Sequence, residues 1–303
     1  MARRDLLGEQ APDDLRHVMS GPLVRGLLDG QLPDGGFGGG FGGGFGGGFG
    51  GDPYRKWTGI HWRLVSLTEL EAEPTPEVLA ALDRELDWLV GSRRLAARPT
   101  VHGLPLSDAS IEGNGLAAAC RLGQAADPRA ARLVEALTAW QWPDGGWNCD
   151  RRASGRRSSF HESLIPMWAL WEYARATADA TAGSAAERTA ELLLEHRLFR
   201  RHGSGQPIHP SWMRLHYPPY WHYDVLHALH LLARMGHARD ERAADALDLL
   251  EERRRPDGRW HADRSWWSRP GSSRAPEAVD WAGAADEMVT LNAMRILRAA
   301  GRA

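Results

Sequence analysis

The chain has 303 residues, 43% of them hydrophobic and 25% charged, so it can bury a sizeable globular core. Its 37 Lys and Arg balance 39 Asp and Glu, and the formal net charge of −2 excludes nucleic acid or an anionic membrane as a bulk electrostatic partner. Two cysteines, Cys120 and Cys149, are too few for a disulfide-stapled secreted scaffold.

No part of the sequence is apolar enough for targeting or for membrane insertion. The N-terminal residues reach Gly and acidic side chains before an apolar run forms, and no stretch of about 18 apolar residues follows. We therefore expect no signal peptide, no integral membrane segment and a cytoplasmic location.

Helical patterns of two kinds alternate along the chain. The first kind is charged on one face, as where Leu79, Leu82 and Leu86 stand beside Asp83, and it suits an outer layer. The second kind is more apolar, as over 159–176, and it suits an inner layer. No alternating strand pattern competes, so we expect an all-α fold of about ten major helices. In chain order the expected helices are 13–30, 58–70, 76–92, 110–123, 128–141, 159–176, 185–197, 220–235, 239–254 and 284–300.

The stretch 35–51 repeats Phe-Gly-Gly-Gly. A glycine-rich run loses too much backbone entropy to form regular structure, so we expect a flexible loop, with a functional lid as the alternative. Shortening Gly38–Gly50 should leave the melting temperature nearly unchanged, because loop-closure entropy depends only weakly on length.

A turn motif recurs after helices of the first kind. It reads QLPDGGF at 31–37, QWPDGGW at 141–147 and RRPDGRW at 254–260, at intervals of about 110 residues. Weaker copies lie between them, near 88–91 and 192–196, so the unit is roughly 55 residues long and occurs about five times. The chain is therefore expected to form one domain, 1–303, of about five helical hairpins.

The turn at 141–147 resembles the Gln–Trp repeat of squalene and hopene cyclases, and its Gly-Gly-Phe/Trp part is similar to turns of protein prenyltransferase β subunits. The resemblance implies an α/α toroid, closed or incomplete, around a central cavity for an apolar or prenyl-type substrate. It implies structural roles for Gln141 and Trp147. The Asp-x-Asp-Asp acid of class II cyclases is absent, and the chain is too short for their second helical domain.

Polar side chains stand at the starts of the expected inner helices, which converge on one mouth in a toroid. We predict that His61, His161, Glu162, His222 and Asp224 are catalytic, with the three histidines on one rim and facing inward. Histidine suits acid/base work near neutral pH. The alternative interpretation is that these groups only cap helix N-termini, where carboxylates are stabilised.

A metal is a third interpretation of the same groups. His161, His222 and Cys149 offer nitrogen and sulfur ligands that suit Zn²⁺. The set resembles the prenyltransferase zinc site, in which Asp, Cys and His come from successive inner helices. The family's Asp-x-Cys at a helix start is absent, so both the cofactor and its identity stay open.

The 14 tryptophans, against 5 Tyr and 6 Phe, predict either large structural side chains or an aromatic cavity. Aromatic faces stabilise cations and stack on sugars, although the same residues could simply pin a large loop. The predicted substrate-binding residues are Trp57, Trp62, Trp212, Tyr220 and Trp221.

The sequence is compatible with three functions. The first is a terpenoid cyclase or prenyltransferase-like enzyme with an apolar small-molecule substrate. The second is a carbohydrate-active toroid, hydrolase or lyase, with Glu162 and Asp224 as its acid/base pair. The third is a non-catalytic repeat scaffold for a protein partner. Aromatic and aliphatic walls would favour the first, an open polar cleft the second and a filled centre the third.

Overall fold

The computed structural model describes residues 1–9, 14–37, 52–91, 94–96, 98–263, 265, 267–273 and 276–302. The expected all-α class is confirmed within these ranges, where the regular strands are the short antiparallel pair β1 (Thr100–Val101) and β2 (Leu104–Pro105). Most of the glycine-rich stretch, residues 38–51, lies outside the described residues. Its first residues, Gly35 to Phe37, belong to a turn in which Gln31 bridges Phe37.

Two series of helices alternate along the chain. The more apolar series is α3 (Ile60–Glu69), α5 (Ala109–Arg121), α7 (Phe160–Thr177), α9 (Val225–Arg234) and α11 (Ala284–Ala300). The more charged series is α2 (Pro22–Leu28), α4 (Pro76–Leu89), α6 (Pro128–Trp140), α8 (Ala180–Glu195) and α10 (Ala244–Glu252). A short π-helix, η1 (Arg3–Leu7), and α1 (Asp14–Ser20) precede them, and short 3-10 turns are η2 (Pro210–Met213), η3 (His237–Arg239) and η4 (Glu241–Ala243).

Capping side chains explain where several of these helices begin. Thr75 accepts from Val78 N ahead of Pro76, and Asp127 accepts from Arg129 N ahead of Pro128. Proline is tolerated in the first helical turn, because an N–H at that position would have no partner within the helix. The side chain of the residue before the proline supplies the N-cap.

Prolines also explain where the structure departs from the expected ranges. The range 13–30 is split into α1 and α2, because Pro22 cannot donate to the preceding turn. The range 220–235 begins as a helix only at Val225, after Pro218 and Pro219.

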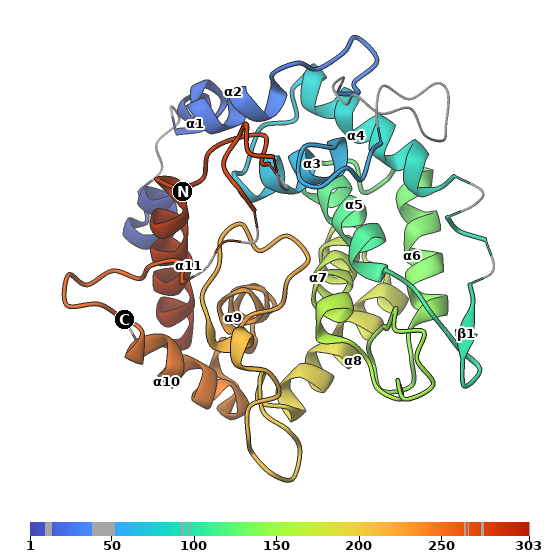
Figure 1. Ribbon diagram of the computed structural model, residues 1–303, viewed down its shortest axis with the longest axis vertical. Helices are drawn as coiled ribbons and strands as arrows, with labels where there is room; N and C mark the ends of the chain where they lie inside the picture. The colour runs from blue at the N-terminus through green and yellow to red at the C-terminus, as the bar shows by residue number, and fades with distance from the viewer. Residues whose placement is uncertain are drawn as a thin grey trace.

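The two series occupy different layers. Figure 1 shows α3, α5, α7, α9 and α11 toward the middle of the view and α2, α4, α6, α8 and α10 around them. Neighbouring inner helices approach closely: a Cβ on Gly113 of α5 would lie 2.9 Å from Pro166 N of α7. A side chain larger than hydrogen at position 113 therefore cannot be accommodated without moving α7.

The turn motif joins one outer helix to the next. Gln141 Nε2 donates to Gly145 O at 2.9 Å and to Ala185 O of α8 at 2.9 Å. Gln31 Nε2 makes the equivalent bonds to Gly35 O at 3.2 Å and Glu77 O of α4 at 2.8 Å.

The aromatic residue that ends the motif donates a hydrogen bond to the helix that precedes the turn. Trp147 is fully buried, and its Nε1 donates to Leu137 O at 2.9 Å. Trp260 Nε1 donates likewise to Leu250 O at 2.7 Å. These bonds give Gln141 and Trp147 a structural role.

The N-terminal segment packs against the last helix, as Figure 1 shows for η1 and α11. Arg295 Nε donates to Asp5 Oδ2 at 2.7 Å, and Arg298 Nη1 donates to Asp5 O at 3.1 Å. Across the described ranges, no helix is both long enough and apolar enough for a bilayer crossing.

Candidate functional site at the N-terminal ends of the inner helices

The starts of α5, α7 and α9 touch one another. Glu162 Oε2 accepts from the backbone N–H of Ser110 at 3.0 Å, which joins α7 to α5. The backbone N–H of Tyr223 donates to His161 Nδ1 at 2.9 Å, which joins the segment before α9 to α7. We call this end of the inner helices the mouth.

Four of the five predicted aromatic residues form one group at the mouth, the aromatic cluster: Trp57, Trp62, Tyr220 and Trp221. Trp57 is stacked on Tyr220, with ring centroids 4.5 Å apart and planes 9° from parallel. Trp62 lies edge-on to Trp57 at 4.7 Å. Lys56 Nζ lies 5.3 Å from the Trp57 ring centroid and 5.0 Å from that of Trp221, so these faces already hold a cation.

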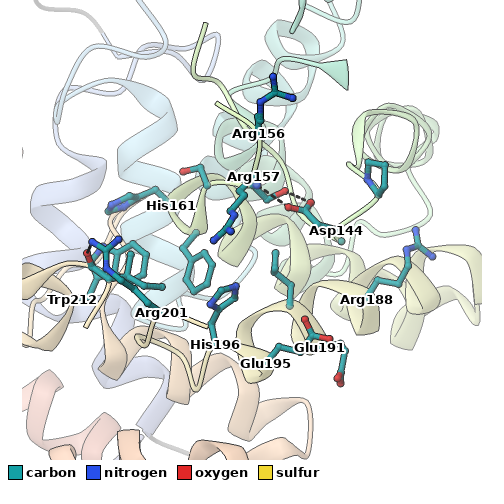
Figure 2. Close-up of a pocket in the computed structure, with 17 residues that line it drawn as sticks. Asp144, Arg156, Arg157, His161, Arg188, Glu191, Glu195, His196, Arg201 and Trp212 are labelled. Atoms are coloured by element: carbon teal, nitrogen blue, oxygen red, sulfur yellow. Dashed lines mark hydrogen bonds between the residues drawn. The ribbon is translucent and has the colours of Figure 1, made fainter. Parts of the chain in front are cut away.

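Trp212, the fifth predicted aromatic residue, lies in a neighbouring group. It is stacked on Phe160 at 4.9 Å and 19°. Together with His161, both rings line a pocket of about 780 Å³ between the start of α7 and α8 (Figure 2). In Figure 2 Arg157 extends into this pocket toward His196.

His161 and His222 also meet at the mouth. Their ring centroids are 6.5 Å apart, and the His222 ring is stacked on Trp221 at 4.0 Å. Burial lowers the pKa of His161 to about 4 and that of His222 to about 3. Both imidazoles are therefore neutral at neutral pH.

Glu162 is the strongest acid/base candidate of the mouth. Its side chain is buried, and burial raises its pKa to about 7, although the Ser110 N–H lowers it in part. A carboxyl group with this pKa is partly protonated at neutral pH, so it can donate a proton. Cys149 Sγ lies 3.6 Å from Glu162 Oε1.

The cluster of possible metal ligands differs from the predicted set. In the part of the chain that the structure describes, Asp108, Cys149 and Glu162 bring one ligand atom each within 4.8 Å of one another, whereas His161 and His222 do not join Cys149 in such a group. The reason is that Cys149 turns toward Glu162. Burial raises the pKa of the Cys149 thiol to about 12, with further contributions from Glu162 and Asp108, so it is protonated at neutral pH.

His61 lies beside the aromatic cluster, with its ring edge-on to Trp62 and the two centroids 4.6 Å apart. Its ring is 1% exposed, and Nδ1 lies 2.6 Å from Glu85 Oε1 on the outer helix α4. Nε2 lies 3.4 Å from Asn114 Nδ2 on α5. The side chain therefore packs between helices, because a buried imidazole needs a polar partner.

Asp224 caps the N-terminus of α9, as the alternative interpretation of the polar groups predicts. It is fully buried, Oδ1 accepts from the backbone N–H of His227 at 2.8 Å, and Oδ2 lies 2.8 Å from His216 Nδ1. Both carboxylate oxygens are thus occupied by the start of α9 and by the loop before it.

Glu277 was missed by sequence analysis. It is 3% exposed, Tyr220 OH donates to its Oε1 at 2.5 Å, and burial raises its pKa to about 7. No repeat or helix-start signal marks position 277, so only the fold brings it under the aromatic cluster.

Comparison with solved structures finds type II terpene cyclase MstE from Scytonema. The apo enzyme is 16% identical with a TM-score of 0.33, and the match covers 97% of this chain and 100% of that one. Variants in complex with geranylgeranyl dihydroxybenzoate and with merosterolic acid A are 17% and 15% identical, with a TM-score of 0.31 each. These matches cover 96% and 95% of this chain, and 98% and 97% of the others. No protein-family model and no curated protein matches the chain.

Proposed function

We propose that this chain is a single-domain α/α toroid and an enzyme that protonates an apolar, prenyl-type substrate at the mouth. The observation that carries the proposal is Glu162, a buried carboxyl group whose pKa burial raises to about 7. Further support comes from the resemblance of the turn motif at 141–147 to the Gln–Trp repeat of squalene and hopene cyclases.

Glu162 interacts electrostatically with Lys56, which lies over the aromatic cluster. Burial lowers the pKa of Lys56, and the Glu162 carboxylate opposes that shift. The Lys56 ammonium in turn lies over the faces of Trp57 and Trp221. A cation formed by proton transfer from Glu162 would therefore arise beside rings that accept positive charge on their faces.

The chemistry follows from these two elements. The O–H bond of Glu162 breaks as a C–H bond forms at one alkene carbon, which leaves a carbocation on the substrate and a carboxylate on the enzyme. Loss of a proton from the substrate later restores the acid. Water must be excluded from the cation, and the buried rings of Trp57, Trp62 and Tyr220 serve that purpose.

The carbohydrate alternative is less well supported. A glycosidase needs a second carboxylate that reaches substrate or water, and both oxygens of Asp224 have partners inside the protein. The scaffold alternative requires no acid and is an outcome of the test.

The test is turnover of unsaturated prenyl compounds in D₂O. Geranylgeraniol and geranylgeranyl dihydroxybenzoate are incubated with the purified chain, and products are analysed by mass spectrometry for incorporated deuterium. We expect deuterated cyclic products from the wild type and from Glu135→Gln, a control on the exposed face of α6. Glu162→Gln should lose at least about 100-fold of the rate, the usual contribution of a general acid.

Equal turnover by Glu162→Gln would reject Glu162 as the acid. A folded wild type that neither binds nor converts these compounds would reject the prenyl substrate and favour a scaffold.

A further inference from the structure

A second polar site lies at the opposite end of the inner helices from the mouth. Figure 1 shows α11 beside the N-terminal segment, and α11 also packs against α9. A pocket of about 520 Å³ opens there, lined by residues of η1, α9, η3 and α11. Five arginines and two carboxylates line it, so its formal charge is +3 with His230 neutral.

The two carboxylates are already paired. Arg4 Nη2 lies 2.8 Å from Glu71 Oε1, and Arg295 Nε lies 2.7 Å from Asp5 Oδ2. A third arginine, Arg234, pairs at 3.0 Å with Glu172, which lies outside the pocket lining.

Among the described residues, the partners of the remaining two arginines, Arg239 and Arg298, are main-chain oxygens. Arg298 Nη1 donates to Asp5 O at 3.1 Å and to Leu6 O, and Arg239 Nε donates to Ala299 O at 3.3 Å. Neither guanidinium forms an ion pair with a carboxylate in the described ranges of the chain. Carbonyl groups orient a guanidinium without neutralising it, so two positive charges remain for a ligand.

A buried histidine adds an independent indication. His230 lines the same pocket and is only 8% exposed, yet its ring makes no hydrogen bond or ion pair with any residue that the structure describes. Burial lowers its pKa well below the usual value, and Arg234 and Arg295 lower it further, so the ring is neutral. A neutral imidazole keeps one N–H that can donate to a ligand in the pocket.

Helix ends alone do not account for this arrangement. Arginines in the last turn of a helix are stabilised by the helix dipole, which explains Arg234 and Arg298. The dipole explains neither Arg239, which lies in η3, nor the unpartnered ring of His230.

We propose that this pocket binds a phosphate group, free or as the head of a small phosphate monoester, through Arg239, Arg298 and His230. Guanidinium groups bind phosphate oxygens through paired N–H donors, and a dianion matches the excess charge better than a carboxylate does. The site lies at the other end of α9 from His222, so it does not depend on the proposed enzymatic activity.

The first experiment is calorimetric titration of the full chain with inorganic phosphate and with glycerol phosphate at constant ionic strength. Acetate and additional chloride serve as anion controls. We expect saturable phosphate binding that Arg239→Gln and Arg298→Gln each weaken by about tenfold or more, since each removes a charge-assisted hydrogen bond. Arg132→Gln is the matched control, because Arg132 also donates to a carbonyl, Val90 O at 3.4 Å, but lies outside the pocket. It should bind phosphate as the wild type does.

Stronger binding of glycerol phosphate than of phosphate would identify a monoester as the ligand, and the reverse would identify the free ion. The second readout is the His230 ring signal in NMR, whose pKa should rise when phosphate binds. Phosphate affinity that is equal in wild type, Arg239→Gln and Arg132→Gln, or no saturation below about 10 mM, would overturn the proposal. Arg239 is exposed and makes a single carbonyl bond, so the Arg239→Gln result holds even if Arg298→Gln does not fold.

Discussion

At the scale of single residues, the mouth favours uncharged forms of its titratable groups. Burial raises the pKa of Glu162 and Glu277 to about 7 and lowers that of His161 and His222 to about 4 and 3. Desolvation disfavours the charged form of either kind of group. Near neutral pH the mouth therefore carries less charge than its composition suggests, which suits an apolar substrate.

Glu162→Gln should change stability in a pH-dependent way. A folded pKa of about 7, above the ordinary value of 4.5, means that the acid stabilises the fold fully below about pH 4.5, and that this contribution is lost as pH rises through 7. Gln imitates the protonated form, so the variant should match the wild type at pH 4 and exceed it at pH 8 by up to about 3 kcal/mol. Urea unfolding at the two pH values measures this. A difference that is the same at both pH values, as expected for Glu135→Gln, would contradict it.

His161→Gln should have the opposite pH dependence. Because the folded pKa is lowered to about 4, the neutral ring contributes stability above pH 6.5 that is lost as pH falls. At pH 5 that loss is about 2 kcal/mol for this group, and the variant should not show it. The exposed His202→Gln is the control, and unfolding free energies at pH 7 and pH 5 provide the measurement. If wild type and His161→Gln lose the same stability on acidification, the ring is not the cause.

The positions of Glu162 and His161 at the mouth were predictable from the sequence. Glu162 and His161 stand at the start of a strongly apolar helix, and equivalent positions in successive hairpins meet at one end. The partners of each group depend on packing across about 50 residues of chain, as for Glu162 with Ser110, 52 residues apart, and were not predictable. His61 shows the same limit, since its ring pairs with Glu85 on α4, 24 residues away.

At the scale of helices and turns, the first glycine of the Pro-Asp-Gly motif is required where the next outer helix leaves no room for a Cβ atom. Gly145 has φ +94°, and a Cβ there would lie 2.5 Å from Arg188 O of α8. Gly35 has φ +82°, and its Cβ would lie 2.3 Å from Ala80 O of α4. Gly258, in the last copy, would meet only the flexible end of Arg254 at 3.5 Å.

Gly145→Ala should therefore destabilise the protein more than Gly258→Ala. Both substitutions force a non-glycine residue into the left-handed region, which costs about 1–2 kcal/mol. Only Gly145→Ala also pushes α8 away, which adds about 1–3 kcal/mol. Chemical denaturation of the two variants measures the difference. Equal losses would mean that the turn does not press on α8.

Helix positions were predictable because apolar spacing and proline are local signals. Helix boundaries were harder to predict near prolines and 3-10 turns. At 220–224, for example, Tyr220 has φ +49° and the helix begins only afterwards. The departure at Pro22 was readable from sequence, since proline within a helical pattern breaks it.

At the scale of the whole molecule, the near-neutral composition conceals a separation of charge. The net charge of −2 averages over all 303 residues, while one pocket at the end of α9 and α11 has a formal charge of +3. Composition carries no spatial information, so neither this pocket nor the pairing of η1 with α11 could be predicted from the sequence.

Asp5→Ala should lower the free energy of unfolding, because Asp5 holds the N-terminal segment against α11. The Asp5 side chain is 19% exposed and pairs with Arg295, which is 15% exposed. Removing the Asp5 carboxylate leaves the half-buried Arg295 guanidinium without one of its negative partners. We expect the free energy of unfolding to fall by about 1–3 kcal/mol. Asp83→Ala is the control, because Asp83 is 60% exposed in its pair with Arg129, and exposed pairs contribute about 0–1 kcal/mol. Thermal unfolding compares them, and an equal shift in Tm would show that the chain ends are not held by this pair.

The turn motif also bears on how the protein is synthesised. Gln31 bonds to Glu77, 46 residues later, and Gln141 bonds to Ala185, 44 residues later. A ribosome makes each turn before it makes the helix that receives it, so the newest hairpin of a nascent chain always has one uncovered side. Among the described elements, η1 must wait longest, because its partner α11 follows all the other helices. Chaperones that bind exposed apolar surface would therefore be needed most at the growing edge, and release would follow the arrival of each outer helix in turn.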